Sequence, residues 1–168
     1  MIEWLLYGTV DFDFISESLL PDLNQGQEEE KLLKVGVMKY DTVLVPNCLT
    51  LRSSTLEILE KFKERGGRVI FAGQLPKYAD ASPSDRGAKL AEKCEIVSFS
   101  KYRLLEAVKE ARDIEVLDDD GKPATNLIYQ MREEGENRWL FLCHVNRTDK
   151  VSDACIVITE LQKSKKNQ

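Results

Sequence analysis

A strand, a helix and a second strand follow one another within residues 40–73, and this segment constrains the fold more than any other. Residues 40–46 (YDTVLVP) form an almost continuous apolar run, which is typical of a strand covered on both faces of a sheet. Residues 54–57 (STLE) match a capping box at a helix start, and apolar side chains follow at helical spacing until the Gly66-Gly67 pair. Residues 68–73 (RVIFAG) are a second apolar run. Because parallel strands need a helical crossover, which is right-handed, we predict a βαβ unit.

The alternation of helix and strand continues and then stops. We predict helices over residues 84–93 and 102–111, and strands over 95–99 and 114–117. Beyond a turn at 118–121, three strands follow without helices between them (127–132, 139–145 and 154–158), with a hairpin loop at 133–138. The sequence therefore predicts an α/β fold: a parallel sheet with helices on both faces, then a short antiparallel β meander. We place the α/β domain at residues 1–122 and the antiparallel β extension at 123–168. The extension would be the start of a β-sandwich.

The N-terminal residues have a pattern of their own. Residues 3–7 read as the last turns of a helix, and Gly8 as its left-handed C-cap. Residues 10–15 alternate apolar and polar side chains, which predicts a strand with Asp11 and Asp13 on one face.

Charge and cysteine content narrow the class of protein. The net charge of -5 argues against a nucleic-acid partner, and no apolar run approaches the roughly 20 residues of a membrane-spanning helix. The four cysteines, Cys48, Cys94, Cys143 and Cys155, form no C-x-x-C pair. Free thiols are typical of a reducing compartment, so we predict a cytoplasmic protein with neither a membrane span nor a secretory signal.

The run Y-D-T-V-L-V-P-N-C-L-T-L-R-S-S-T-L-E-I-L-E-K-F-K-E-R-G-G-R-V-I-F-A-G resembles part of a known domain family. It is similar to the class I glutamine amidotransferase-like, flavodoxin-like α/β domain of multidomain glycoside hydrolases. That domain follows the catalytic barrel, as in the trimerisation domain of some β-galactosidases and in rhamnosidase-type proteins. D-F-D-F-I-S (residues 11–16) resembles the strand before this unit, and residues 126–147 resemble the hairpin that leads into a β-sandwich. The resemblance spans roughly residues 8–147.

The resemblance implies a non-catalytic structural or interface module of a carbohydrate-active enzyme. The expected partners are the rest of a larger glycoside hydrolase chain and other copies in a homo-oligomer. True class I amidotransferases carry a cysteine nucleophile directly after the strand matched by residues 69–72, where this chain has Gly73-Gln74-Leu75-Pro76. The resemblance also places a strand and most of a helix before residue 1. We therefore expect a fragment whose first strand is missing and whose exposed edge another copy covers.

A second function remains open, that of a small stand-alone enzyme or ligand-binding protein. Open α/β sheets bind ligands at the carboxyl ends of their strands. Asn47, Cys48, Arg52 and Gln74 fall there and are the candidate ligand-binding residues. A Cys48 nucleophile would need a base, and His144 is the only histidine.

Other candidate groups give weaker indications of a chemical function. Asp11 with Asp13, or residues 118–120, could supply a carboxylate pair for glycoside hydrolysis, but solvated side chains or a turn explain them more simply. Four aromatic side chains could stack on sugars or pack in the core: Trp4, Tyr7, Phe12 and Phe14. Phosphate-binding glycine loops and metal-ligand spacings are absent from the sequence, so we predict no catalytic residue, metal or cofactor.

Overall fold

The computed structural model describes residues 1–24, 31–118, 120–124 and 127–145, and the backbone of 154–158. The chain divides into two compact units, which are described separately. One is Asp13–Ala107, and the other combines Met1–Phe12 with Val108–Gln168. The division after Ala107 lies within the predicted helix 102–111, and the predicted boundary after residue 122 lies inside the second unit.

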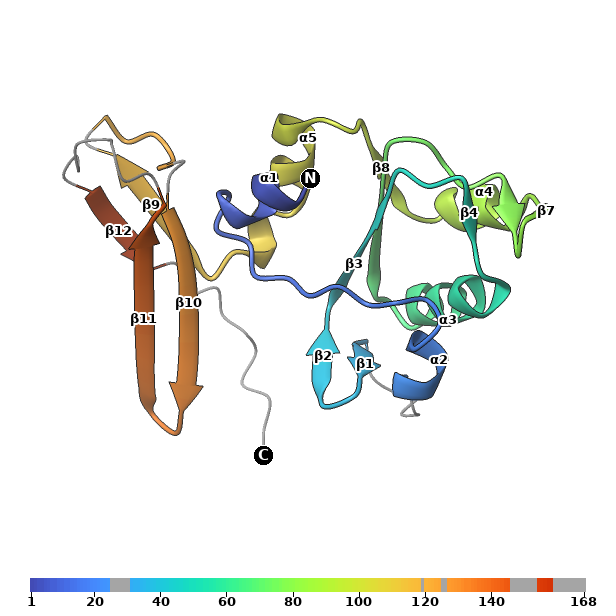
Figure 1. Cartoon of the computed structure of the whole chain (residues 1–168), viewed down its shortest axis with the longest axis horizontal. Helices are drawn as coiled ribbons and strands as arrows, with labels where there is room; N and C mark the ends of the chain where they lie inside the picture. Colours follow the sequence, from blue (N-terminus) through green and yellow to red (C-terminus); the bar gives the residue numbers. More distant parts are fainter. Residues whose placement is uncertain (25–30, 119, 125–126, 146–153, 159–168) are drawn as a thin grey trace. The chain divides into compact units, whose positions relative to one another are not determined.

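The unit Asp13–Ala107 is built on a parallel sheet in the order β3-β5-β8, of which Figure 1 labels β3 and β8. Its strands are β3 (Thr42–Pro46), β5 (Arg68–Ala72) and β8 (Glu95–Val97). Helix α3 (Ser53–Glu64) connects the first two strands, α4 (Arg86–Ala91) connects the next two, and α5 (Lys101–Ala107) follows β8. The predicted βαβ unit and α/β class are confirmed.

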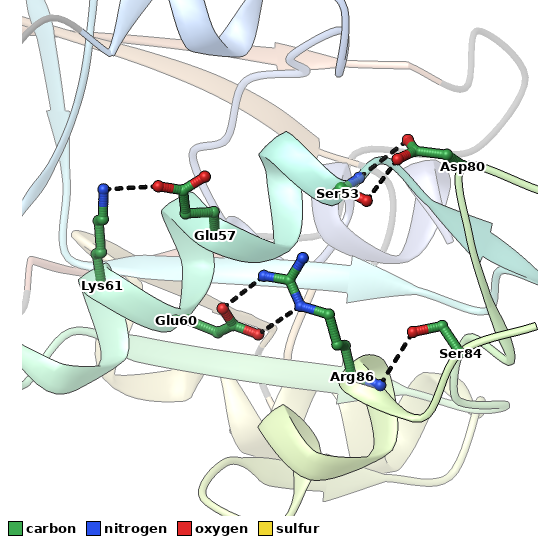
Figure 2. Close-up of polar contacts among 7 residues, drawn as sticks. All are labelled: Ser53, Glu57, Glu60, Lys61, Asp80, Ser84 and Arg86. Atoms are coloured by element: carbon green, nitrogen blue, oxygen red, sulfur yellow. Dashed lines mark hydrogen bonds and ion pairs between the residues drawn. The ribbon is translucent and has the colours of Figure 1, made fainter. Parts of the chain in front are cut away.

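The core of this unit lies between the sheet and helices α3 and α4. Val45, Val69 and Phe71 from the strands pack in one cluster with Leu56, Leu59, Phe62, Leu90 and Ala91 from the two helices. The guanidinium of Arg86 adds a two-pronged contact between the helices: Nη2 donates to Glu60 Oε2 at 2.7 Å and Nε to Oε1 at 3.3 Å (Figure 2).

The opposite face of the sheet carries α5. Side chains alternate along a strand, so Arg68 and Ile70 point away from the α3 side. Arg68 Nη2 donates a hydrogen bond to the carbonyl of Ala107 at 2.6 Å, and Ile70 is fully buried. Helix α5 therefore lies on the side of the sheet opposite α3.

Helix α3 starts earlier than predicted, and the prediction of a capping box is wrong. Arg52 is the N-cap and its side chain makes no capping bond. Because the helix already includes Ser53, Ser54 cannot be the N-cap. Asp80 caps it instead: Oδ1 accepts the Ser53 backbone N–H at 3.0 Å, and Oδ2 accepts the Ser53 hydroxyl (Figure 2). Glu57, expected to cap, pairs with Lys61 at 2.8 Å.

The small elements of this unit escape sequence reading because they are too short to show a period. They are α2 (Leu20–Leu23), the hairpin of β1 (Leu33–Val35) and β2 (Met38–Tyr40), and a second sheet of β4 (Thr50–Leu51), β6 (Tyr78–Ala79) and β7 (Ser82–Pro83).

The second unit is mostly antiparallel. It contains α1 (Ile2–Leu6), the 3-10 helix η1 (Lys109–Ala111), and strands β9 (Ile114–Asp118), β10 (Leu127–Glu134), β11 (Asn137–His144) and β12 (Ala154–Ile158). The predicted hairpin is confirmed as β10-β11. Two expectations are wrong: β9 does not join the parallel sheet, and β12 pairs with β9 instead of following β11 in a meander.

Two predictions for the N-terminal residues are also wrong. The left-handed residue after α1 is Thr9, with φ 53°, and not Gly8. Its hydroxyl bonds to the carbonyls of Gly8 and Ile114 at 2.8 and 3.0 Å. Residues 10–15 form no strand, and the division between the units separates Asp11 from Asp13.

Candidate functional site

Hydrogen bonds within the chain connect the carboxyl ends of the three parallel strands. Asn47 follows β3, and its Oδ1 accepts the backbone N–H of Gln74, which follows β5, at 2.8 Å. The backbone N–H of Gly73 donates to the carbonyl of Val97 at the end of β8, at 2.9 Å. The structure thus brings together two predicted ligand-binding residues, Asn47 and Gln74, but the amide oxygen of Asn47 already has an intramolecular donor.

Gly73 occupies the tight turn at which the resemblance would place a nucleophile. Its φ of 94° is a conformation that L-residues rarely adopt. A Cβ added there would lie 3.0 Å from the Cβ of Phe99 and 3.3 Å from that of Asn47. The turn has neither the thiol of a class I amidotransferase nor ready space for one.

Cys48 lies at the same edge, half-buried against the core of the unit. Burial raises the pKa of its thiol, and the negative charge of Glu17 raises this pKa further. The thiolate is the reactive form of cysteine, so both effects lower its reactivity. His144, the expected base, belongs to the other unit, so the Cys48–His144 pair is not a site within either unit.

The start of α3 is occupied by carboxylates. The backbone N–H of Arg52 donates to Glu17 Oε2 at 2.7 Å, beside the Asp80 cap on Ser53. A helix N-terminus attracts anions through such free N–H groups, and here protein side chains already satisfy two of them. Arg52 thus takes part in this edge through its backbone N–H, which bonds to Glu17.

Glu17 and Asp80 were not anticipated as members of this edge. Each acts on a partner distant in the sequence: 35 residues separate Glu17 from Arg52, and 27 separate Asp80 from Ser53. Of the four predicted ligand-binding residues, Asn47, Arg52 and Gln74 are exposed and Cys48 is half-buried. Asn47 and Gln74 are joined by a hydrogen bond, and Arg52 is bonded through its backbone to Glu17.

The remaining candidate groups are dispersed. Asp13 accepts a hydrogen bond from the Tyr40 hydroxyl, and Asp118 Oδ1 accepts the backbone N–H groups of Asp120 and Lys122 in the predicted turn. Phe14 is 66% exposed. The part of the chain that the structure describes holds no group of three His, Cys, Asp or Glu side chains placed to bind a metal. None of its helices has the length and apolar character to cross a membrane.

Asp80 and Ala81 form the turn between β6 and β7, and both have left-handed φ angles (48° and 63°). A left-handed conformation costs a non-glycine residue about 1–2 kcal/mol. We expect Ala81→Gly to raise the free energy of unfolding by about 1 kcal/mol. Asp80→Ala, which removes the cap of α3, should lower the free energy of unfolding.

Urea unfolding followed by circular dichroism measures both changes. Asp85→Ala is the matched control, because Asp85 precedes α4 without a side-chain capping bond and forms only an exposed pair with Lys89. The bonds from Ser53 lower the pKa of Asp80, so the loss caused by Asp80→Ala should disappear in acid, where the carboxyl is protonated. An Asp80→Ala variant as stable as wild type at neutral pH contradicts the cap.

Comparisons with protein-family models, with curated proteins and with solved structures find no match to this chain.

Proposed function

We propose that this chain is a non-catalytic structural and interface module of a larger glycoside hydrolase. The observation that carries the non-catalytic part is the set of groups found at the strand ends. There the turn at Gly73 has no nucleophile, Cys48 has a raised pKa, and carboxylates occupy the start of α3.

The parent enzyme class is supported by the sequence resemblance of residues 40–73. The strand order adds to this support: β3, β5 and β8 lie side by side in sequence order, like the strands on one side of a flavodoxin-like sheet. The proposed partners are the remainder of a glycoside hydrolase chain and further copies of this one. The free thiols of Cys48, Cys94 and Cys143 favour the cytoplasm as its location.

The alternative function is a small enzyme or binding protein that uses Cys48, and it requires a reactive thiol. It needs a thiolate that is populated at neutral pH and open to reagents.

Site-resolved alkylation with iodoacetamide separates the two functions. We expect Cys48 in the folded chain to react severalfold more slowly at neutral pH than in urea, and its rate to rise as the pH approaches the raised pKa. Glu17→Gln removes a charge that raises this pKa, so it should increase the rate modestly. The Cys48→Ser variant lacks this thiol and so identifies the alkylation signal that belongs to Cys48.

An activated thiol would overturn the proposal. If Cys48 in the folded chain is alkylated faster at neutral pH than in urea, the alternative function gains the support that the non-catalytic module loses. Turnover of aryl glycosides by the purified chain, abolished by a substitution within it, would also contradict the proposal.

A further inference from the structure

The two faces of the β10-β11 hairpin differ in burial. The hairpin is a two-stranded sheet in the second unit (Figure 1), and successive side chains of each strand alternate between its faces. One face carries Tyr129, Met131, Leu140 and Leu142. All four are half-buried, and the hydroxyl oxygen of Tyr129 is shielded from solvent. This face is therefore partly covered by the chain itself.

The other face presents two exposed aromatic side chains, each opposite a planar polar group. Trp139 is 51% exposed and lies across the hairpin from Arg132. Phe141 is 64% exposed and lies across from Gln130. Both polar side chains are exposed as well. These four residues are called the aromatic platform below, and its two aromatic positions are about 7 Å apart along β11.

The aromatic platform is small for a protein–protein interface. A large aromatic side chain has about 150–250 Å² to bury, so the exposed fractions of Trp139 and Phe141 amount to roughly 200–250 Å². A stable interface between proteins buries about 800 Å² on each partner. The exposed rings therefore match a ligand with the dimensions of a few rings better than a second protein chain.

The charges beside the aromatic platform favour an uncharged ligand. Residues 132–136 (REEGE), at the end of the hairpin, carry three carboxylates and one guanidinium. Aromatic surfaces that stack the bases of single-stranded nucleic acids are combined with a positively charged groove, whereas this chain has a net charge of -5. Phosphate-bearing polymers are therefore disfavoured.

Neutral sugars offer the groups that such a surface can bind. A pyranose ring has an apolar face of C–H groups, which packs against an aromatic ring and removes apolar surface from water. The hydroxyl groups at its rim both donate and accept hydrogen bonds. The amide of Gln130 supplies a donor and an acceptor beside the rings, and the guanidinium of Arg132 supplies donors.

We propose that the aromatic platform binds a neutral oligosaccharide, with successive sugar rings against Trp139 and Phe141. Gln130 and Arg132 hydrogen-bond to the hydroxyl groups of these sugars. The inference goes beyond the proposed structural role, because it adds a non-catalytic carbohydrate-binding surface. This surface belongs to a different unit from the strand ends around Cys48.

Affinity electrophoresis of the full chain tests the binding, in native gels that contain hydroxyethyl cellulose, mixed-linkage β-glucan, xyloglucan or galactomannan. We expect at least one of these neutral polysaccharides to slow the wild-type chain. Trp139→Ala and Phe141→Ala should each weaken this binding by about tenfold or more, through the loss of apolar contact. Tyr102→Ala is the matched control, because Tyr102 is an aromatic residue, 72% exposed, in the other unit.

Tryptophan fluorescence reports on the platform without altering it. The chain has two tryptophans, so Trp4→Phe leaves Trp139 as the only one. Titration of this variant with a hexasaccharide of the polysaccharide that slows the chain should change the emission of Trp139 saturably. The affinity should be the same in low and high salt, because the ligand is uncharged.

Four results overturn the inference. The first two are mobility that none of the four polysaccharides changes, and retardation that both alanine variants retain. The third is an emission of Trp139 that the hexasaccharide leaves unchanged. The fourth is a different occupant: binding of oligothymidylate, or a self-association of the chain, that Trp139→Ala abolishes. Each of these results leaves the proposed function in place, whereas a reactive Cys48 counts against that function and not against the platform.

Discussion

Phe62→Ala is expected to lower the free energy of unfolding by about 3–5 kcal/mol, the usual loss for a large buried aromatic side chain. Phe62 is fully buried, on the face of α3 that packs against β3 and β5. Truncation removes apolar contacts and leaves a cavity between helix and sheet. The midpoint of urea unfolding, followed by far-ultraviolet circular dichroism, measures the loss.

Lys61→Ala is the matched control in the same helix. Lys61 is exposed and pairs only weakly with Glu57, so the control should cost no more than about 0.5 kcal/mol. A loss below about 1 kcal/mol for Phe62→Ala would show that α3 does not pack on the sheet as described.

The βαβ unit could be predicted because its signals are local. The apolar runs of β3 and β5 and the helical spacing of Leu56, Leu59 and Phe62 each lie within one element. The start of α3 could not be predicted, because its capping group, Asp80, comes from a turn 27 residues away. The local Ser-x-x-Glu pattern predicted a capping box that does not form. Tertiary contacts decide which carboxylate reaches the start of the helix.

Alternation at residues 10–15 predicted a strand that is absent. A period of two shows only that side chains alternate, whereas a strand also requires a neighbour that accepts its backbone bonds. Thr9 turns the backbone with a positive φ, and Asp13 is held by Tyr40.

The location of the candidate site could be predicted from the sequence, but the reactivity of its side chains could not. The rule that ligands bind at strand ends located Asn47, Cys48 and Gln74 correctly at one edge. The raised pKa of Cys48 depends on its burial and on Glu17, which no spacing in the sequence connects to it.

Gly67→Ala is expected to lower the free energy of unfolding by about 1–3 kcal/mol, through overpacking. Helix α3 ends in a Schellman motif: Gly66 is left-handed with φ 91°, its N–H bonds to the carbonyl of Lys63, and the N–H of Gly67 bonds to that of Phe62. A Cβ on Gly67 would lie 2.2 Å from the Phe62 ring, which is buried in the core and cannot move aside freely.

A double-mutant cycle separates this steric cause from a backbone cause. Gly67 lies outside the left-handed region, so its backbone tolerates alanine once the ring is gone. In a Phe62→Ala background, Gly67→Ala should therefore become neutral or stabilising by about 0.4–1 kcal/mol, because alanine restricts the unfolded chain. Gly66→Ala is the contrasting variant: its cost comes from φ and should persist in both backgrounds. If Gly67→Ala costs the same with and without the Phe62 ring, the close packing of the helix end against that ring is contradicted.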